Sequence, residues 1–228
     1  MDLATRQVTR STVGKKAVMA VTGIVLVLFL VLHMAGNLKI FVGAESFDHY
    51  AHWLRTIGAP VLPETWYLWI QRVALLAAVL GHIWSAASLA LRARAARPVK
   101  YAHRRPVKGS YAARTMRWGG VIIVLFVAYH ILDLTTGDLN PVGDSSTPHA
   151  NVVADFAPER WYVTLFYVLA IAALAFHIRH GIFSALRTLG QRTQSGERRA
   201  KAIALAVAVV LTVGFLSVPI AVTTGLIQ

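Results

Sequence analysis

The chain has 228 residues, of which 56% are hydrophobic and only 14% are charged. Together with a mean hydropathy of +0.56, this composition excludes an ordinary soluble domain and predicts an integral membrane protein. Cysteine is absent, which excludes iron–sulfur clusters and structural zinc sites held by thiolates of this chain.

Five apolar stretches are long enough to cross a bilayer, whose hydrocarbon core needs roughly 20 helical residues. We therefore expect an all-α integral membrane protein with a single domain, 1–228, whose five transmembrane helices lie near 17–42, 66–91, 118–136, 161–186 and 202–224. A secretory signal peptide is the alternative for the first stretch, because Lys15 and Lys16 precede it. We prefer a retained helix, since the stretch continues into Asn37 and Lys39 without a clear small-residue cleavage site.

The formal net charge of +13 does not indicate nucleic-acid binding, because the basic residues do not form one basic face. They gather before the first stretch and in the loops 92–117 and 187–201, whereas most acidic residues lie in the other loops. By the positive-inside rule, this predicts a protein of the cell (inner) membrane with a cytoplasmic N-terminus and its C-terminus outside. The two basic loops are then docking surfaces, and the outer loops 43–65 and 137–160 are short lids or interfacial helices.

The two halves of the chain share a weak repeat. Pro63–Tyr67 reads PETWY and Pro158–Tyr162 reads PERWY, and a histidine, His82 or His177, follows each proline at the same distance. A duplicated helical hairpin explains this pattern, with chance similarity as the alternative.

Four of the nine histidines occur once in each of the first four stretches, at nearly equal intervals: His33, His82, His130 and His177. A histidine within the membrane is costly and usually faces the bundle interior. Because a helix rises about 1.5 Å per residue, His82 and His177 lie about 15 Å from the cytoplasmic helix ends, and His33 and His130 lie about 20–25 Å from them. The four therefore form an inner pair, His82 with His177, and an outer pair, His33 with His130.

Paired histidines on separate helices suit the two axial positions of a haem iron, and bis-histidine ligation favours electron transfer over oxygen binding. We thus predict that the first four helices form a diheme four-helix bundle. Zinc is the competing metal, but it fits poorly because no carboxylate or thiolate lies near either pair. A hydrogen-bonded interior histidine is the alternative for each one taken singly.

Three more residues are candidates for cofactor contacts. His180 lies three residues from His177 and competes with it as the inner ligand, although the repeat favours His177; otherwise His180 contacts a propionate or a quinone. Arg72 and Arg179 lie near helix ends, where haem propionates would balance their charges. Snorkelling to lipid head groups is the alternative for both arginines.

Short segments around these histidines carry a resemblance over about 11–190: STVGKK at 11–16, HMAGNL at 33–38, ESFDHYA at 45–51, His82, Tyr129–His130, FHIRHG at 176–181, Ser184 and Leu189–Gly190. In these segments the chain resembles the diheme succinate dehydrogenase cytochrome b subunits of the b558 type, relatives of the five-helix fumarate reductase anchors. The combination is specific, although each segment is short.

This resemblance implies the membrane anchor of respiratory complex II in the tricarboxylic acid cycle. A partner flavoprotein with FAD would oxidise succinate in the cytoplasm, and a partner iron–sulfur protein would pass the electrons to this anchor. The anchor would hold two haem b groups, the inner one on His82 and His177 and the outer one on His33 and His130, and would reduce a quinone. It would contact the bilayer and these partners but no nucleic acid, with a higher oligomer of the complex left open.

Two haems favour a quinone site near the outer surface, because a site at the inner face would need only one. An inside-negative potential favours outward electron movement by about 2.3 kcal/mol per charge per 100 mV, which would assist the reduction of menaquinone, a weak oxidant. Asp133 and Glu64 are candidate proton carriers for this site, with ordinary polar residues at helix ends as the alternative.

The sequence leaves other functions open. A fumarate reductase anchor would run the same electron path in reverse, and a diheme cytochrome b could serve a different dehydrogenase. A histidine-based proton-coupled transporter is disfavoured, because the spans lack the Gly and Pro interruptions expected at a substrate site in the middle of the membrane.

Overall fold

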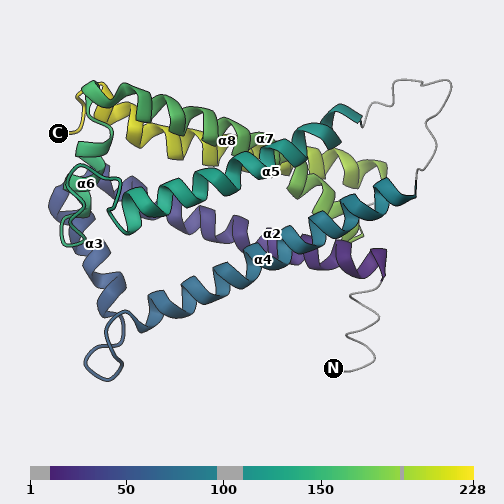
Figure 1. Ribbon diagram of the computed structural model, residues 1–228, viewed down its shortest axis with the longest axis horizontal. Coiled ribbons are helices and arrows are strands. Elements are labelled where there is room, and N and C mark those ends of the chain that lie inside the picture. Colours follow the sequence, from purple (N-terminus) through teal and green to yellow (C-terminus); the bar gives the residue numbers. More distant parts are fainter. Residues whose placement is uncertain (1–10, 97–109, 191–192) are drawn as a thin grey trace.

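Five long helices make up most of the computed structural model, which describes residues 11–96, 110–190 and 193–228 (Figure 1). They are α2 (Thr12–Asn37), α4 (Trp66–Ala95), α5 (Ser110–His130), α7 (Trp161–Thr188) and α8 (Gln194–Thr223). Each belongs to a segment long and apolar enough to cross a membrane, and no strand occurs in the described residues. The prediction of an all-α membrane protein with five transmembrane helices is confirmed.

The short elements gather at one end of the bundle, which we call the α3 end (Figure 1). They are the 3₁₀-helix η1 (Leu38–Val42), α3 (Ala44–Thr56), the π-helical turn η2 (Ile131–Thr135), α6 (Pro148–Asp155) and the 3₁₀-helix η3 (Pro158–Arg160). Helix α8 also ends here, whereas α2 begins at the opposite end. Both predicted outer loops thus contain short helices.

The long helices extend past the apolar stretches that predict them. Helix α2 begins at Thr12, and α8 begins at Gln194, inside the predicted loop 187–201. Ser11 and Thr193 cap these helices, because each side-chain oxygen accepts a backbone N–H three residues further on, at 2.9 and 3.1 Å. A helical turn in water needs no apolar residues, so hydropathy alone underestimates the length of both helices.

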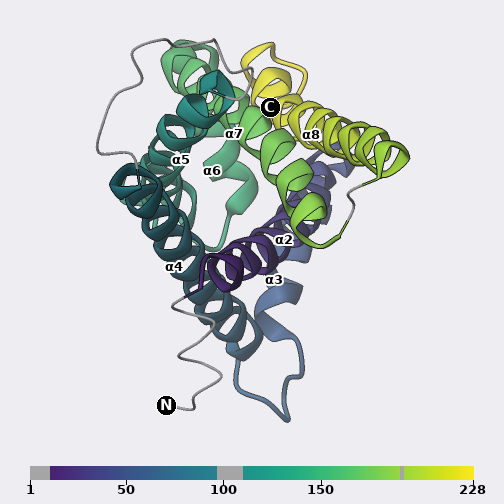
Figure 2. The same ribbon diagram turned by 90° about the vertical axis from the view of Figure 1, so that its right-hand side faces the viewer.

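Helix α7 lies at the centre of the bundle. It packs along α8, α2 and α5, and α2 packs along α4 in turn, so the helices follow each other in the order α4, α2, α7, α5 (Figure 2). Helix α8 lies outside this row, against α7 and α2. Small residues allow the close approach: a Cβ atom at Gly214 on α8 would overlap the side chain of Met34 on α2.

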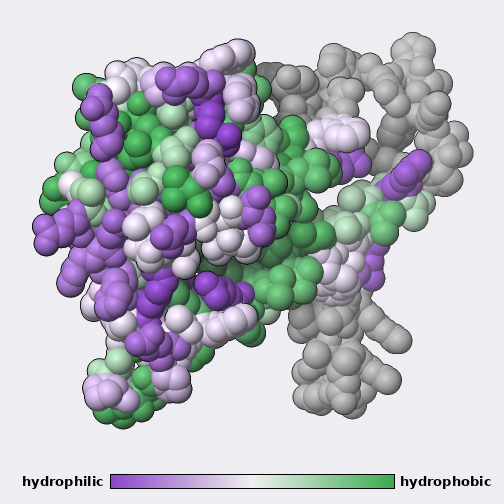
Figure 3. Space-filling model, turned by 60° about the vertical axis from the view of Figure 1, so that its left-hand side comes forward, coloured by the Kyte–Doolittle hydropathy of each residue, from purple (hydrophilic) through white to green (hydrophobic). Residues whose placement is uncertain are grey.

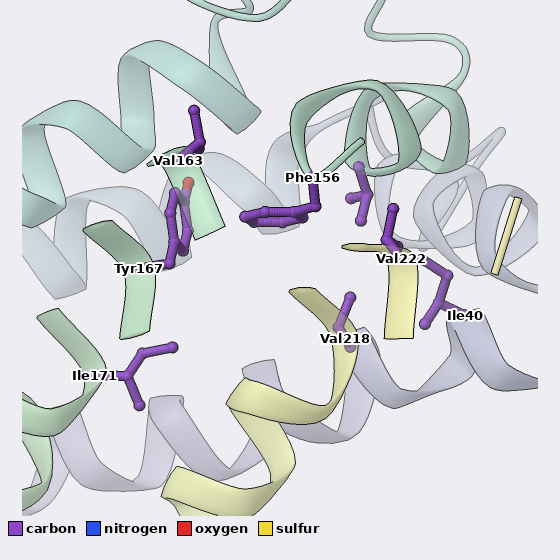
Figure 4. Close-up of a cluster of buried hydrophobic side chains, with 8 residues drawn as sticks. Ile40, Phe156, Val163, Tyr167, Ile171, Val218 and Val222 are labelled. Carbon is purple, nitrogen blue, oxygen red and sulfur yellow. The ribbon is translucent and has the colours of Figure 1, made fainter. Parts of the chain in front are cut away.

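A cluster of buried apolar side chains lies near the α3 end, between η1, the segment around α6, α7 and α8 (Figure 4). Ile40, Phe156, Tyr167 and Val218 belong to it. Elsewhere the long helices expose many large apolar side chains. Figure 3 shows hydrophobic residues over the helices behind a more hydrophilic end. In a bilayer, these exposed apolar side chains face the lipid.

Candidate functional site

The four histidines predicted as ligands lie on four different helices and meet in two pairs. The ring centres of His33 on α2 and His130 on α5 are 5.8 Å apart. Those of His82 on α4 and His177 on α7 are 6.2 Å apart. Each pair connects two helices that are not consecutive in the row α4, α2, α7, α5. The rings therefore meet across the interior of the four-helix arrangement.

Both separations fit one iron atom between two rings. An imidazole nitrogen binds a transition metal at about 2 Å and the ring centre lies about 1 Å behind it, so two rings on opposite sides of one metal have centres about 6 Å apart. A structural zinc site needs four ligands, whereas in the described ranges no three His, Cys, Asp or Glu side chains come together to hold a metal ion. The two-ligand geometry is the one that bis-histidine haem requires.

A threonine hydroxyl orients His82. The hydroxyl of Thr22 on α2 donates to the carbonyl oxygen of Val18 at 2.7 Å, and its oxygen lies 3.2 Å from Nδ1 of His82. Because the hydroxyl proton is already used, Nδ1–H of His82 is the donor in the second bond. This network assigns the proton to Nδ1 and leaves the lone pair of Nε2 for a metal.

A tyrosine hydroxyl orients His130 in the same way. The phenol of Tyr167 on α7 donates to Oδ2 of Asp133 at 2.8 Å, and its oxygen lies 3.3 Å from Nδ1 of His130. Nδ1–H of His130 is therefore the donor to the phenol oxygen, and Nε2 keeps its lone pair. In each pair, one histidine thus donates a hydrogen bond to a hydroxyl oxygen, and the proton of that hydroxyl group is used in a hydrogen bond to a third group.

The π-helical turn η2 continues α5 directly past His130. The N–H of Thr136 donates to the carbonyl oxygen of Ile131, five residues earlier, at 2.8 Å, which is the bond that defines a π-helix. Asp133 lies on this turn and is 0% exposed. The turn thus places the buried carboxyl group of Asp133 where only Tyr167 separates it from the predicted ligand His130.

Aromatic rings flank the outer pair. Phe29 stacks on His33 at 5.3 Å and Phe126 stacks on His130 at 5.8 Å, each from four residues earlier on the same helix. The ring centre of Phe215 on α8 lies 5.8 Å from that of His33. These contacts restrict both rings to one orientation and surround them with apolar groups.

Glycines leave room beside the inner pair. A Cβ atom at Gly23 on α2 would lie 3.3 Å from Cε1 of His82, closer than side chains normally pack. A Cβ atom at Gly120 on α5 would lie 3.8 Å from Cε1 of His177, an ordinary contact. Gly23 therefore lets the backbone of α2 approach His82 closely, whereas the position of Gly120 has room for a methyl group beside His177.

A second buried carboxyl group, Asp155 at the end of α6, accompanies Asp133. It is also 0% exposed, and its Oδ1 accepts a hydrogen bond from Nη2 of Arg160 at 2.9 Å. The pKa of Asp155 is raised to about 7, first by burial and then by hydrogen bonding to Asp133 and the charge of Asp133, while Arg160 acts in the opposite direction.

Comparison with known proteins identifies the family of the chain. The model of the succinate dehydrogenase/fumarate reductase transmembrane subunit family matches residues 91–215, more than half of the sequence. The chain belongs to this family. The matched region contains His130, His177, Tyr167 and both buried aspartates, Asp133 and Asp155. Neither a curated protein nor a solved structure gives a match.

As a succinate dehydrogenase/fumarate reductase transmembrane subunit, the chain is the multi-pass membrane anchor of an oxidoreductase complex and associates with its catalytic subunits. His33 and His82 precede the matched region, so their place in the anchor rests on their geometry. The basic loop 92–117, predicted to face the catalytic subunits, lies partly outside the described residues, which omit 97–109.

Three other predicted contact residues of this anchor lie at its surface or one turn from the inner pair. Arg72 and Arg179 are exposed, and the guanidinium group of Arg72 lies over the ring of Trp69 at 5.1 Å. His180 is half-buried, one helical turn beyond His177. The stacking of Arg72 on a surface tryptophan is typical of an arginine at the membrane interface.

The two candidate proton carriers of the anchor lie in different surroundings. Asp133 is fully buried and is joined to His130 through Tyr167. Glu64 is exposed in the segment before α4, and within the described part of the chain no hydrogen bond joins it to either histidine pair. The structure therefore brings Asp133, and not Glu64, into the network around the outer pair.

Thr22, Tyr167 and Asp155 are site residues that sequence reasoning missed. Tyr167 carried a signal, because a phenol within an apolar helix needs a hydrogen-bond partner. Thr22 carried none, since its hydroxyl is already satisfied by its own helix. Asp155 stood among other acidic residues in a predicted outer loop, and nothing there indicated burial.

Proposed function

We propose that this anchor is the cytochrome b subunit of a succinate dehydrogenase (succinate:quinone oxidoreductase, respiratory complex II), with two haem b groups on the route from the iron–sulfur subunit to menaquinone. The observation that carries the proposal is the spacing of the two histidine pairs, 5.8 and 6.2 Å between ring centres. Bound haem would supply one-electron transfer between the iron–sulfur subunit and the quinone.

In this proposal, His82 and His177 are the axial ligands of the inner haem, and His33 and His130 are those of the outer haem. Thr22 and Tyr167 hold His82 and His130 with Nε2 free to bind iron. His180 is the rival ligand to His177 or, with the two exposed arginines Arg72 and Arg179, a contact for propionates or quinone.

Quinone reduction needs protons as well as electrons, and we propose a quinone site at the α3 end. Asp133 is buried there beside the outer pair, and Glu64 is exposed at the same end; these are the proposed proton carriers. With a cytoplasmic N-terminus, the α3 end faces outside. Electrons then move outward, which an inside-negative potential favours by about 2.3 kcal/mol per charge per 100 mV.

A haem assay per chain and a reduced-minus-oxidised spectrum of the purified complex test the haem proposal. We expect two b haems in the wild type and one in each of the variants His82→Ala and His130→Ala, with the surface variant His52→Ala as the control that keeps both. A complex with its catalytic subunits bound but without haem contradicts the proposal.

The direction of electron flow needs a second measurement, because the family includes fumarate reductases. In intact vesicles, we expect succinate-dependent menaquinone reduction to slow when the membrane potential is dissipated. An unchanged rate contradicts the outer quinone site. Faster fumarate reduction with menaquinol than succinate oxidation with menaquinone would instead assign the complex as a fumarate reductase.

A further inference from the structure

The α3 end contains a buried acid pair that ligation of iron does not require. Asp133 and Asp155 come from different elements, η2 and the end of α6, and both are 0% exposed. Acidic side chains are almost never fully buried unless they are paired. Within the described part of the chain, one cation, Arg160, bonds Asp155 at 2.9 Å, so a single positive charge accompanies two carboxyl groups there.

A continuous series of contacts runs from the protein surface through this acid pair to the outer histidine pair. The Arg160 side chain is 24% exposed and bonds Oδ1 of Asp155. Asp155 interacts with Asp133, which accepts the phenol hydrogen of Tyr167. Tyr167 in turn lies 3.3 Å from Nδ1 of His130. A charge change at either end of this series therefore acts on the other through a low-dielectric interior.

The acid pair can hold one proton. Two neighbouring buried carboxylates cannot both ionise at low cost, because like charges repel strongly where water is excluded. Oδ2 of Asp155 is buried, and among the described residues no donor group bonds it. A negative charge on that oxygen is costly, and a proton there removes the charge. In agreement, the pKa of Asp155 is raised to about 7.

We propose that Asp155, together with Asp133, is a proton-binding site whose occupancy is coupled to the charge of the outer haem through Tyr167 and His130. This inference rests on the proposed ligation of haem by His33 and His130. With haem held by His33 and His130, Asp155 would take up a proton from the water at the α3 end, past Arg160, when that haem is reduced. It would release the proton when the electron leaves.

Apart from Asp133, the groups around Asp155 include no further buried carboxyl group among the described residues. The charges of Asp133 and Arg160 act on the pKa of Asp155, and the phenols of Tyr129 and Tyr167 face the same acid pair. Asp48 of α3 bonds the backbone N–H of His149, at the far end of α6, at 2.8 Å. Helix α8 contributes the uncharged hydroxyl of Thr223, which donates to the carbonyl of Phe156 at 3.0 Å.

Redox titration of both haems in the purified complex at a series of pH values tests the coupling. In the wild type, we expect the outer potential to fall as the pH rises through about 7, since loss of the proton leaves a negative charge that disfavours reduction. In Asp155→Asn this dependence should shrink several-fold, while the inner potential keeps the wild-type pH dependence. Asp144→Asn, which changes an exposed carboxyl group of the same outer segment, should behave as the wild type.

Two further variants keep the test decisive if Asp155→Asn does not assemble. Tyr167→Phe retains both carboxyl groups and removes the link to His130, so we expect a weaker pH dependence of the outer potential and less proton uptake on reduction. Asp155→Glu retains a titratable group and should keep the coupling. In reduced-minus-oxidised infrared spectra, a carboxyl C=O band should appear in the wild type, persist in Asp155→Glu and shrink in Tyr167→Phe. An outer potential with unchanged pH dependence in Asp155→Asn, or in Tyr167→Phe, overturns the inference.

The haem assay separates this inference from the proposed function. A complex without haem refutes the proposed function and the coupling with it. Two haems with an outer potential that does not depend on pH refute only the proton site, and leave the diheme anchor in place.

Discussion

Thr22 and His82 are joined across α2 and α4 by a hydrogen bond of 3.2 Å between Oγ1 and Nδ1. The threonine proton is used in a bond to its own helix, so the oxygen serves as an acceptor for the histidine. A single hydroxyl thus fixes both the tautomer and the angle of a predicted iron ligand.

Thr22→Val should weaken haem binding at the inner pair. Valine keeps the shape of threonine but offers no acceptor, and loss of such a partner typically costs 10–100-fold in affinity (about 1.4–2.7 kcal/mol) in metal sites. Haem retained after extensive washing measures the effect. Thr22→Ser should retain both haems, and so should Thr212→Val, which removes a hydroxyl that bonds only its own helix, at 2.7 Å. Equal retention in Thr22→Val and Thr212→Val would contradict this role.

A graded series of alanines should show how closely the helices approach the inner pair. Gly23→Ala brings a methyl group to 3.3 Å from His82, Gly120→Ala brings one to 3.8 Å from His177, and Gly181→Ala meets nothing within 4 Å. We expect the inner-haem absorbance to be reduced in the first, nearly normal in the second and unchanged in the third. A reversed order would mean that these glycines do not serve the histidines.

Gly214→Ala should loosen the contact between α2 and α8, because its new methyl group overlaps the side chain of Met34. Overpacking of this kind typically costs about 1–3 kcal/mol, visible as a lower unfolding temperature of the purified protein. Adding Met34→Ala should recover part of the loss by making room. A double variant less stable than either single variant would place the strain elsewhere.

The stability of the α3 end should depend on pH through Asp155. Its pKa in the folded state, about 7, lies above the ordinary aspartate value of 3.8, so the folded state binds the proton more tightly than the unfolded state. This contribution is fully present below about 4 and is lost as the pH rises through about 7. The unfolding temperature should therefore fall over this range, by about 2–4 °C for each kcal/mol of unfolding free energy that is lost.

Asp155→Asn should reduce this fall in the unfolding temperature, because asparagine does not ionise. Asp144→Asn is the matched control and should keep the wild-type profile. Identical profiles in the wild type and in Asp155→Asn would show that another group is responsible.

Much of the fold followed from two simple properties of the sequence. Apolar stretches predicted five spans because the thickness of a bilayer fixes the length of a crossing helix. The fixed helical rise then separated His82 and His177 from His33 and His130 by depth. In the structure the rings meet in these two pairs, and their role as haem ligands stays a prediction.

The residues that surround the predicted ligands, such as Thr22 and Asp155, could not be predicted, because their positions depend on the rotation of each helix about its axis. Thr22 reaches His82 only because α2 presents that face to α4. Asp155 is buried because α6 folds back over η2, a contact that no periodic pattern records. Hydropathy also failed at the helix ends in water, where Ser11 and Thr193 decide where α2 and α8 begin.

The π-helical turn after His130 makes the direction of the Asp133 side chain independent of the direction of the His130 side chain. In a regular helix, the direction of Asp133 would follow from that of His130, because each residue turns by the same angle. The wider turn, with its bond from Thr136 to Ile131, gives the carboxyl group an angular register of its own. Deleting Ile131 or Leu132 would restore α-helical geometry and rotate Asp133 away from Tyr167 while His130 still faces His33. The acid could thus be gained or lost without disturbing the ligand.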